Sequence, residues 1–310
     1  MYELIIKKIK KGLFCEAARE IKSLTNDEIE NILVLSLGVG SDITSYAFAN
    51  YLILDKTYSF FAQKICYNLC DSLFNYLFGA IYSTYAHVSC MIELRPDDFS
   101  ILELQAYLYE IPDEVFTPVE MYHIAKNLLS INPKSAESKY CFNRTKEYSS
   151  EPLEFPWDGL FGIEKTKILI EKGRFSKALA NLASHSREEL FTLLRIFARD
   201  GFLYAYSFVW AMIREEEKVD LHLLAAEFFL DQYVPFLAKG YYGREGVAFF
   251  HTHRAVELEP ENVEIIEQLL EIYELTPESF EPEEAKVFVE KVLAQKPESK
   301  AALHVLGELS

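Results

Sequence analysis

The chain carries two similar segments, and this repetition constrains the fold more than any other sequence feature. Residues 87–135 align without a gap with residues 251–299, at an offset of 164 positions, and 15 of the 49 aligned pairs are identical. About three identities would arise by chance at ordinary residue frequencies. The sequence therefore predicts an internal duplication.

The duplication predicts two halves, at residues 1–142 and 161–310. Residues 143–160 are expected to form the linker between them. They include Ser149, Ser150, Pro152, Pro156 and Gly159, which are residue types that favour turns and loops.

Four prolines mark expected helix ends. Pro96 and Pro133 of the first segment correspond to Pro260 and Pro297 of the second, and the prolines of each segment lie 37 residues apart. Proline lacks a backbone N–H and disfavours the α conformation of the residue before it, so helices usually stop just before it. Apolar residues recur at helical spacing between the prolines, as along residues 263–273. The pattern predicts two helices per repeat, as in α-solenoids.

Each segment also contains a second helix start. Pro118 and Pro282 suit the first helical position, where an N–H is not needed. Thr117 is expected to cap the helix that begins at Pro118. Phe116 and Phe280 precede these starts and are predicted to be hydrophobic staples, buried against the first turn.

A G-x-F-x-x-A pattern occurs in both halves, at an offset of 161 positions. Its residues are Gly12, Phe14 and Ala17 in the first half and Gly173, Phe175 and Ala178 in the second. Glycine can end one helix, phenylalanine can pack back on it, and alanine allows close approach of the next helix. A structural role is predicted for these residues.

This pattern resembles the turn between the two helices of a tetratricopeptide repeat. The residues Ala-Val-Glu-Leu-Glu-Pro-Glu-Asn at 255–262 resemble the end of the second helix of that repeat. The resemblance implies antiparallel helix pairs stacked into an α–α superhelix, and a role in binding proteins. Since no alternating strand pattern persists, we predict an all-α, tetratricopeptide-like protein with two duplicated halves.

The net charge bears on the partner class. Lys and Arg number 31 against 48 Asp and Glu, which gives −17. Such a charge opposes nucleic acid and anionic membranes, and favours a basic partner. Acidity that serves solubility alone is the competing interpretation. We predict no nucleic-acid partner.

An uncharged stretch raises a membrane alternative. Residues 72–92 contain no Asp, Glu, Lys or Arg, which is near the length of a membrane span. The corresponding part of the second half carries Lys239, Arg244, Glu245 and Arg254. A buried helix pair is therefore expected, and no membrane partner is predicted.

The cysteines indicate the redox compartment. All five, Cys15, Cys66, Cys70, Cys90 and Cys141, lie in the first half. A disulfide framework on which the fold depended would be expected in both halves, so reduced thiols and a cytoplasmic location are predicted. The N-terminal residues also lack the order of charged and apolar residues of a signal peptide.

Motifs for chemistry are weak. Cys66 and Cys70 share a helix face and offer a metal site with Cys90 or His87, but buried thiols are the favoured interpretation. Residues 38–41 (Gly-Val-Gly-Ser) lack the lysine and preceding strand of a phosphate loop, and are predicted to be a turn. We predict no catalytic residue, no metal and no cofactor.

Four aligned side chains are candidates for partner binding. His87 and His251 are identical where their neighbours differ, and each is expected either to tie helices together while buried or to contact a partner. Tyr109 and Tyr273 are aligned rings of a type that suits protein recognition.

Two functions are consistent with these features. The first is a non-catalytic module that binds a protein or peptide, with a basic partner as one option. The alternative is an acidic immunity protein that neutralises a basic toxin or enzyme. Clustered acidic residues would favour neutralisation, whereas an even scatter would favour solubility.

Overall fold

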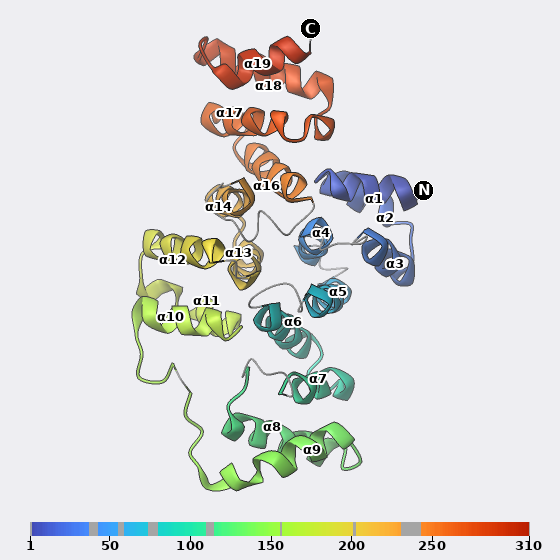
Figure 1. Cartoon of the computed structure of the whole chain (residues 1–310), viewed down its shortest axis with the longest axis vertical. Coiled ribbons are helices and arrows are strands. Elements are labelled where there is room, and N and C mark those ends of the chain that lie inside the picture. The colour runs from blue at the N-terminus through green and yellow to red at the C-terminus, as the bar shows by residue number, and fades with distance from the viewer. Residues whose placement is uncertain are drawn as a thin grey trace. The chain divides into compact units, whose positions relative to one another are not determined.

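The computed structural model of the chain describes residues 2–36, 43–54, 59–73, 80–109, 115–155, 157–200, 203–230 and 243–309. These residues form 18 α-helices and short 3₁₀ helices, without a strand among them (Figure 1). Consecutive helices pack in pairs, which is compatible with a helical repeat. The all-α prediction is confirmed.

The first helices follow one another with short connections. They are α1 (Tyr2–Lys10), α2 (Phe14–Ile21), α3 (Asn26–Ser36), α4 (Ile43–Leu54), α5 (Ser59–Leu73), α6 (Ala80–Leu94), α7 (Phe99–Tyr109), α8 (Pro118–Ile131), α9 (Ala136–Thr145) and η1 (Lys146–Ser150).

The remaining described helices are α10 (Gly162–Glu171), α11 (Phe175–Ala180), η2 (Leu182–Ser184), α12 (Arg187–Arg199), α13 (Leu203–Glu215), α14 (Val219–Leu230), α16 (Arg244–Leu258), α17 (Val263–Glu271), η3 (Ile272–Glu274), η4 (Pro277–Ser279), α18 (Pro282–Gln295) and α19 (Lys300–Glu308). Within the described ranges, no helix combines the length and apolarity that crossing a bilayer requires.

The helix ends agree with the proline pattern. α6 and α16 end two residues before Pro96 and Pro260, and α8 and α18 end two residues before Pro133 and Pro297. Pro118 and Pro282 open α8 and α18, and the Thr117 hydroxyl accepts a hydrogen bond from the Glu120 N–H at 3.1 Å. Phe116 and Phe280 are buried, which a packing role requires.

Helices at aligned positions have matching bounds. α6 and α16 are both 15 residues long and begin 164 positions apart, and α8 and α18 are both 14 residues long with the same offset. These bounds are compatible with the duplication predicted from the sequence.

The chain forms two compact units, and each draws on both halves of the sequence. Unit 1 comprises Met1–Asp55, Ala198–Gly201 and Val209–Ser310, and unit 2 comprises Lys56–Phe197 and Phe202–Phe208. The predicted halves at 1–142 and 161–310 remain a prediction about the repeat, since the compact units group the helices differently.

Two glycine turns join the distant segments of each unit. In unit 1, the turn at Gly12 (φ 76°) packs on the backbone of Gly246 in α16, so that α2 lies beside α16 (Figure 1). In unit 2, the turn at Gly173 (φ 66°) packs on the backbone of Tyr82 in α6. Positions 82 and 246 are 164 apart, so the two turns meet aligned positions on their partner helices.

The phenylalanines of these turns enter the cores. The Phe14 ring stacks on Phe250 with centroids 4.3 Å apart, and Phe175 packs edge-on against Phe208 at 5.2 Å. Ala17 and Ala178 are fully buried. The side chains of the G-x-F-x-x-A pattern thus connect helices that are far apart in the sequence.

The predicted linker, residues 143–160, is part of unit 2. Residues 143–145 complete α9, η1 follows them, and Trp157 is buried. The Trp157 ring stacks on Phe155 at 4.7 Å, and the Lys177 ammonium lies 5.0 Å from its centroid. The turn residues of this segment do not indicate such packing, because it depends on one side chain, that of Trp157.

The contact between the Gly12 turn and Gly246 gives a first prediction, which concerns Gly246. Alanine usually stabilises a helix by about 1 kcal/mol over glycine. At Gly246, however, a Cβ would overlap the Lys10 carbonyl and lie 3.1 Å from the Gly12 nitrogen. We therefore expect Gly246→Ala to lower the free energy of unfolding by about 1–3 kcal/mol in urea denaturation.

Gly307 is the matched control, since it also lies in a helix but a Cβ there meets nothing within 4 Å. Gly307→Ala is expected to be neutral or to gain up to about 1 kcal/mol. A gain in stability at both positions would contradict the close approach of α16 to the Gly12 turn.

Candidate functional site

The G-x-F-x-x-A turn of unit 1 also positions a cavity. Because Gly12 turns the chain sharply, the first residues of α2 face α16 and the start of α18. A cavity of about 160 Å³ lies between these elements. Its lining comprises Gly12, Leu13, Phe14, Cys15, Glu16, Arg19, Phe249, Phe250, His253, Arg254, Glu257, Glu281 and Glu284.

The lining combines aromatic rings with an excess of negative charge. Its carboxylates come from Glu16, Glu257, Glu281 and Glu284, and its guanidinium groups from Arg19 and Arg254. Four carboxylates less two guanidinium groups leave two negative charges, with the rings of Phe14, Phe249 and Phe250 beside them. Outside the lining, Lys8 pairs with Glu16 at 2.9 Å. This composition suits a cationic group better than an anionic one.

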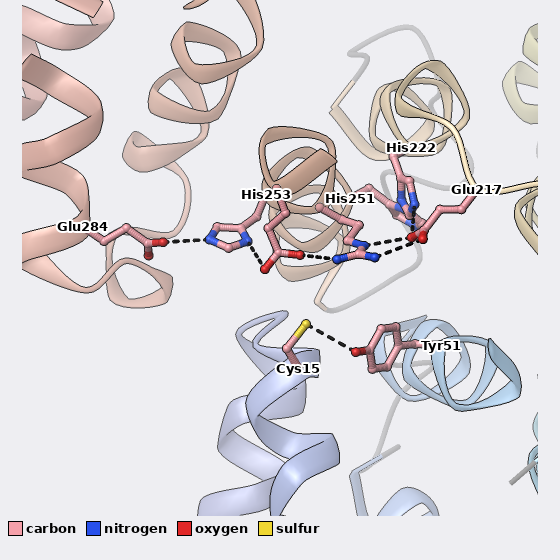
Figure 2. A network of polar contacts seen from close by, with 9 residues as sticks. Cys15, Tyr51, Glu217, His222, His251, His253 and Glu284 are labelled. Carbon is pink, nitrogen blue, oxygen red and sulfur yellow. Dashed lines mark hydrogen bonds and ion pairs between the residues drawn. The ribbon is translucent and has the colours of Figure 1, made fainter. Parts of the chain in front are cut away.

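His253 connects two of the carboxylates. Its Nε2 lies 3.0 Å from Oε1 of Glu284, and its Nδ1 lies 3.8 Å from Oε1 of Glu257 (Figure 2). The imidazole is 5.4 Å from the Phe249 ring, centroid to centroid. His253 therefore holds α16 to α18 at one edge of the cavity.

Arg254 organises the other edge. Its Nε and Nη2 donate to the two oxygens of Glu217 at 2.8 and 3.0 Å, and its Nη1 donates to Glu257 at 2.7 Å. Hydrogen bonds from His222 and Arg254 lower the pKa of Glu217 to about 2. The bidentate geometry fixes the guanidinium plane, so this part of the wall is preorganised.

A buried pair of histidines lies behind Arg254. Nδ1 of His222 is 2.9 Å from Nδ1 of His251, and Nε2 of His222 is 3.1 Å from Oε1 of Glu217 (Figure 2). One set of neutral tautomers satisfies both contacts: His251 donates to His222, and His222 donates to Glu217. Burial lowers the pKa of both histidines.

The single thiol in the lining is held by a tyrosine. The Tyr51 hydroxyl donates to Sγ of Cys15 at 3.3 Å (Figure 2). Burial raises the pKa of Tyr51, with this hydrogen bond as the second cause. The tyrosine therefore stays a phenol at neutral pH and serves as a donor to sulfur.

The histidine pair predicts a pH dependence of stability. Its neighbours are Glu217, Arg254 and Glu257 around His222, and the Trp210 and Phe250 rings around His251. Because the folded pKa of each histidine lies below the unfolded value of about 6.5, the unfolded state binds protons first as the pH falls. Stability is then lost below about pH 6.5, by up to about 1.4 kcal/mol per pH unit for each histidine. Glu217 is still a carboxylate in this range.

Thermal unfolding at pH 5 to 7.5 measures this dependence. We expect the parent melting temperature to fall as the pH falls, and the fall to be smaller in His251→Gln. The half-exposed His304, changed to Gln, is the control and should leave the profile as in the parent. Equal profiles for the parent and His251→Gln would contradict the assignment.

The four candidates from the sequence lie elsewhere. His87 is buried in unit 2, with Nδ1 2.5 Å from Oε1 of Gln63, and His251 is buried in unit 1. Tyr109 packs against the core of unit 2, and the Tyr273 ring lies 5.1 Å from Phe280. None of the four belongs to the lining of the cavity. A direct partner contact by these residues remains a prediction.

Most of the cavity residues of α16 differ between the two aligned segments. His253 and Arg254 align with Ser89 and Cys90, so a search for identities excludes them. Glu284 is identical to Glu120 at this offset, but a glutamate in the first turn of a helix also fits a capping role. The available signal was the change from Ser-Cys to His-Arg on one helix face.

The thiols form no disulfide among the described residues, which include all five cysteines. The same residues contain no group of three or more His, Cys, Asp and Glu arranged to hold a metal ion. The turn predicted at 38–41 lies outside the described residues.

No model of a protein family matches the chain, and a search of curated proteins finds no significant match.

Proposed function

We propose that the chain is a non-catalytic interaction module that binds a protein or peptide. The observation that carries this proposal is the acidic, ring-lined cavity of unit 1, whose polar walls are fixed by ion pairs. Carboxylates beside aromatic rings are the surroundings that basic side chains of proteins prefer.

We further propose that the scaffold is tetratricopeptide-like and arose by duplication into two halves, with helix pairs stacked into a superhelix. The matching bounds of α6 with α16 and of α8 with α18 support this origin. The two glycine turns support it as well, because each meets an aligned position on its partner helix.

The alternative function is neutralisation of a basic toxin or enzyme. The net charge of −17 and the acidic cavity favour a basic partner in both cases. The two functions differ in the effect of binding on the partner's activity. A neutralised partner has an activity that the chain abolishes.

Affinity capture with a quantitative follow-up tests the proposal. The immobilised chain is exposed to lysate of the source organism, next to an unrelated protein of similar net charge. A protein retained only by this chain is then produced and titrated calorimetrically at several salt concentrations. We expect saturable binding that weakens with salt. Retention of the same proteins on both matrices would reject the proposal, and loss of the partner's activity on binding would select neutralisation.

A further inference from the structure

Unit 2 contains a cation in the place that corresponds to the cavity of unit 1. Arg174 directly follows the Gly173 turn, and its side chain is 7 % exposed. Its Nη2 donates to Oε1 of Glu120 at 2.6 Å and to the Val115 carbonyl at 3.3 Å, and its Nη1 donates to the Tyr85 hydroxyl.

Aromatic rings complete this site. The Arg174 guanidinium carbon lies 4.2 Å from the Tyr85 ring centroid and 5.2 Å from that of Phe116. The Trp157 ring is 5.5 Å away on a third side. A guanidinium group between rings and a carboxylate is favourably placed for cation–π and charge-assisted contacts.

The residue that corresponds to Arg174 in unit 1 is Leu13, at the offset of 161 positions. The backbones agree closely, with φ −77° and ψ 58° at Leu13 and φ −83° and ψ 56° at Arg174. Both residues follow a left-handed glycine and precede a helix. Their side chains therefore leave the turn in the same direction relative to α2 and α11.

The carboxylate and one ring position of the cation site are retained in unit 1. Glu284 aligns with Glu120, and Phe249 aligns with Tyr85, each at the offset of 164 positions. Leu13, Phe249 and Glu284 all line the cavity of unit 1. Unit 1 thus has the carboxylate and the ring, while the short apolar Leu13 leaves a cavity where the arginine side chain of unit 2 lies.

We propose that the cavity of unit 1 binds an arginine side chain of a partner protein or peptide, with the guanidinium group paired to Glu284 and stacked on Phe249. This inference rests on the proposed function and names the chemistry of the partner. The cavity of about 160 Å³ accommodates the four heavy atoms of a guanidinium group, given about 30 Å³ for each water-sized group.

Arginine fits this cavity better than lysine. The planar guanidinium can lie flat on the Phe249 ring while its N–H groups reach a carboxylate, whereas an ammonium group offers a point charge without a planar face. His253 already lies beside Phe249 and contacts Glu284, so the incoming group shares this carboxylate with the imidazole. Glu281 supplies further negative charge beside it, whereas Glu16 pairs with Lys8 and Glu257 pairs with Arg254.

Three small probes test the chemistry: N-acetylarginine amide, the neutral isostere N-acetylcitrulline amide, and N-acetyllysine amide. Their binding to the full chain is followed by protein-detected NMR at low salt. We expect the arginine probe to shift signals of α2, α16 and α18, and to bind at least tenfold more tightly than the citrulline probe. Equal binding of arginine and citrulline probes would overturn the inference.

Two variants, each with a matched control, locate the site. Leu13→Arg should fill the cavity from within the chain, as Arg174 fills its counterpart, and abolish binding of the arginine probe. Leu13→Met changes the side chain without adding charge and should bind as the parent does. Glu284→Gln should weaken binding at least tenfold. Glu283→Gln, on the same helix turn but with an 89 % exposed side chain, should leave it unchanged.

Circular dichroism melts establish that each variant is folded. If the folded Leu13→Arg and Glu284→Gln variants bind the arginine probe like the parent, the inference fails. If a captured protein partner binds parent and Leu13→Arg equally, the proposed interaction function stands and only the arginine site is rejected. If the arginine probe binds but no protein is captured specifically, the site stands and the interaction function fails.

Discussion

Replacing Gly173 with alanine is expected to lower the free energy of unfolding by about 2–5 kcal/mol. A left-handed conformation at a residue with a Cβ costs about 1–2 kcal/mol. In addition, the new Cβ would overlap the Tyr82 carbonyl, so the turn or α6 must move, at a further cost of about 1–3 kcal/mol. Chemical denaturation followed by circular dichroism measures the loss.

Gly159 offers a matched control within the same unit. Its φ of 77° is close to the 66° of Gly173, but a Cβ there meets nothing within 4 Å. Gly159→Ala is therefore expected to lower the free energy of unfolding only by the cost of the left-handed conformation, about 1–2 kcal/mol. Similar losses in both variants would show that backbone strain alone matters, and that the contact with Tyr82 does not hold unit 2 together.

Replacing Arg174 with alanine is expected to lower the free energy of unfolding of the chain by about 3–5 kcal/mol, because it leaves Glu120 buried without its cation. Burial raises the pKa of Glu120, whereas the guanidinium 2.6 Å away favours the carboxylate. At this distance we expect an ion pair in the parent. Without Arg174, Glu120 must be buried as a charge or take up a proton.

Two comparisons separate this effect from lost packing. The double variant Arg174→Leu, Glu120→Gln removes both charges and should recover most of the stability. The defect of Arg174→Ala should also be smaller at pH 5 than at pH 8. The folded pKa of Glu120 then lies above the unfolded value, so protonation at the lower pH stabilises the folded state. A defect that is independent of pH would indicate that the ring contacts, rather than the charge, dominate.

Local features were readable from the sequence because they act over a few residues. Pro118 and Pro282 favour a helix start, because proline after an extended residue suits the first helical position. Gly12 and Gly173 determine a left-handed turn in the same way, since few other residues accept that conformation. The all-α architecture and the helix ends at the prolines followed from such signals.

The pairing of distant segments was not readable. The apolar face of α2 would be satisfied by any helix of suitable shape, and nothing near Phe14 in the sequence specifies Phe250. The cavity has the same origin, since Leu13 and Glu284 meet only through that pairing. The burial of Arg174 could not be read from the sequence either, because a basic side chain in a turn is usually solvated.

Unit 1 combines segments from both ends of the chain, so the ribosome synthesises its parts at different times. The Gly12 turn needs Gly246, which is synthesised 234 residues later. At a rate of about 5–20 residues per second, α1 and α2 emerge about 12–47 s before their partner helix exists. During that interval Phe14, which is buried in the finished unit, lacks the Phe250 ring on which it stacks. Most of unit 2 is one continuous stretch that is completed earlier. The contacts of α2 with α16 are therefore among the last that unit 1 can form during synthesis.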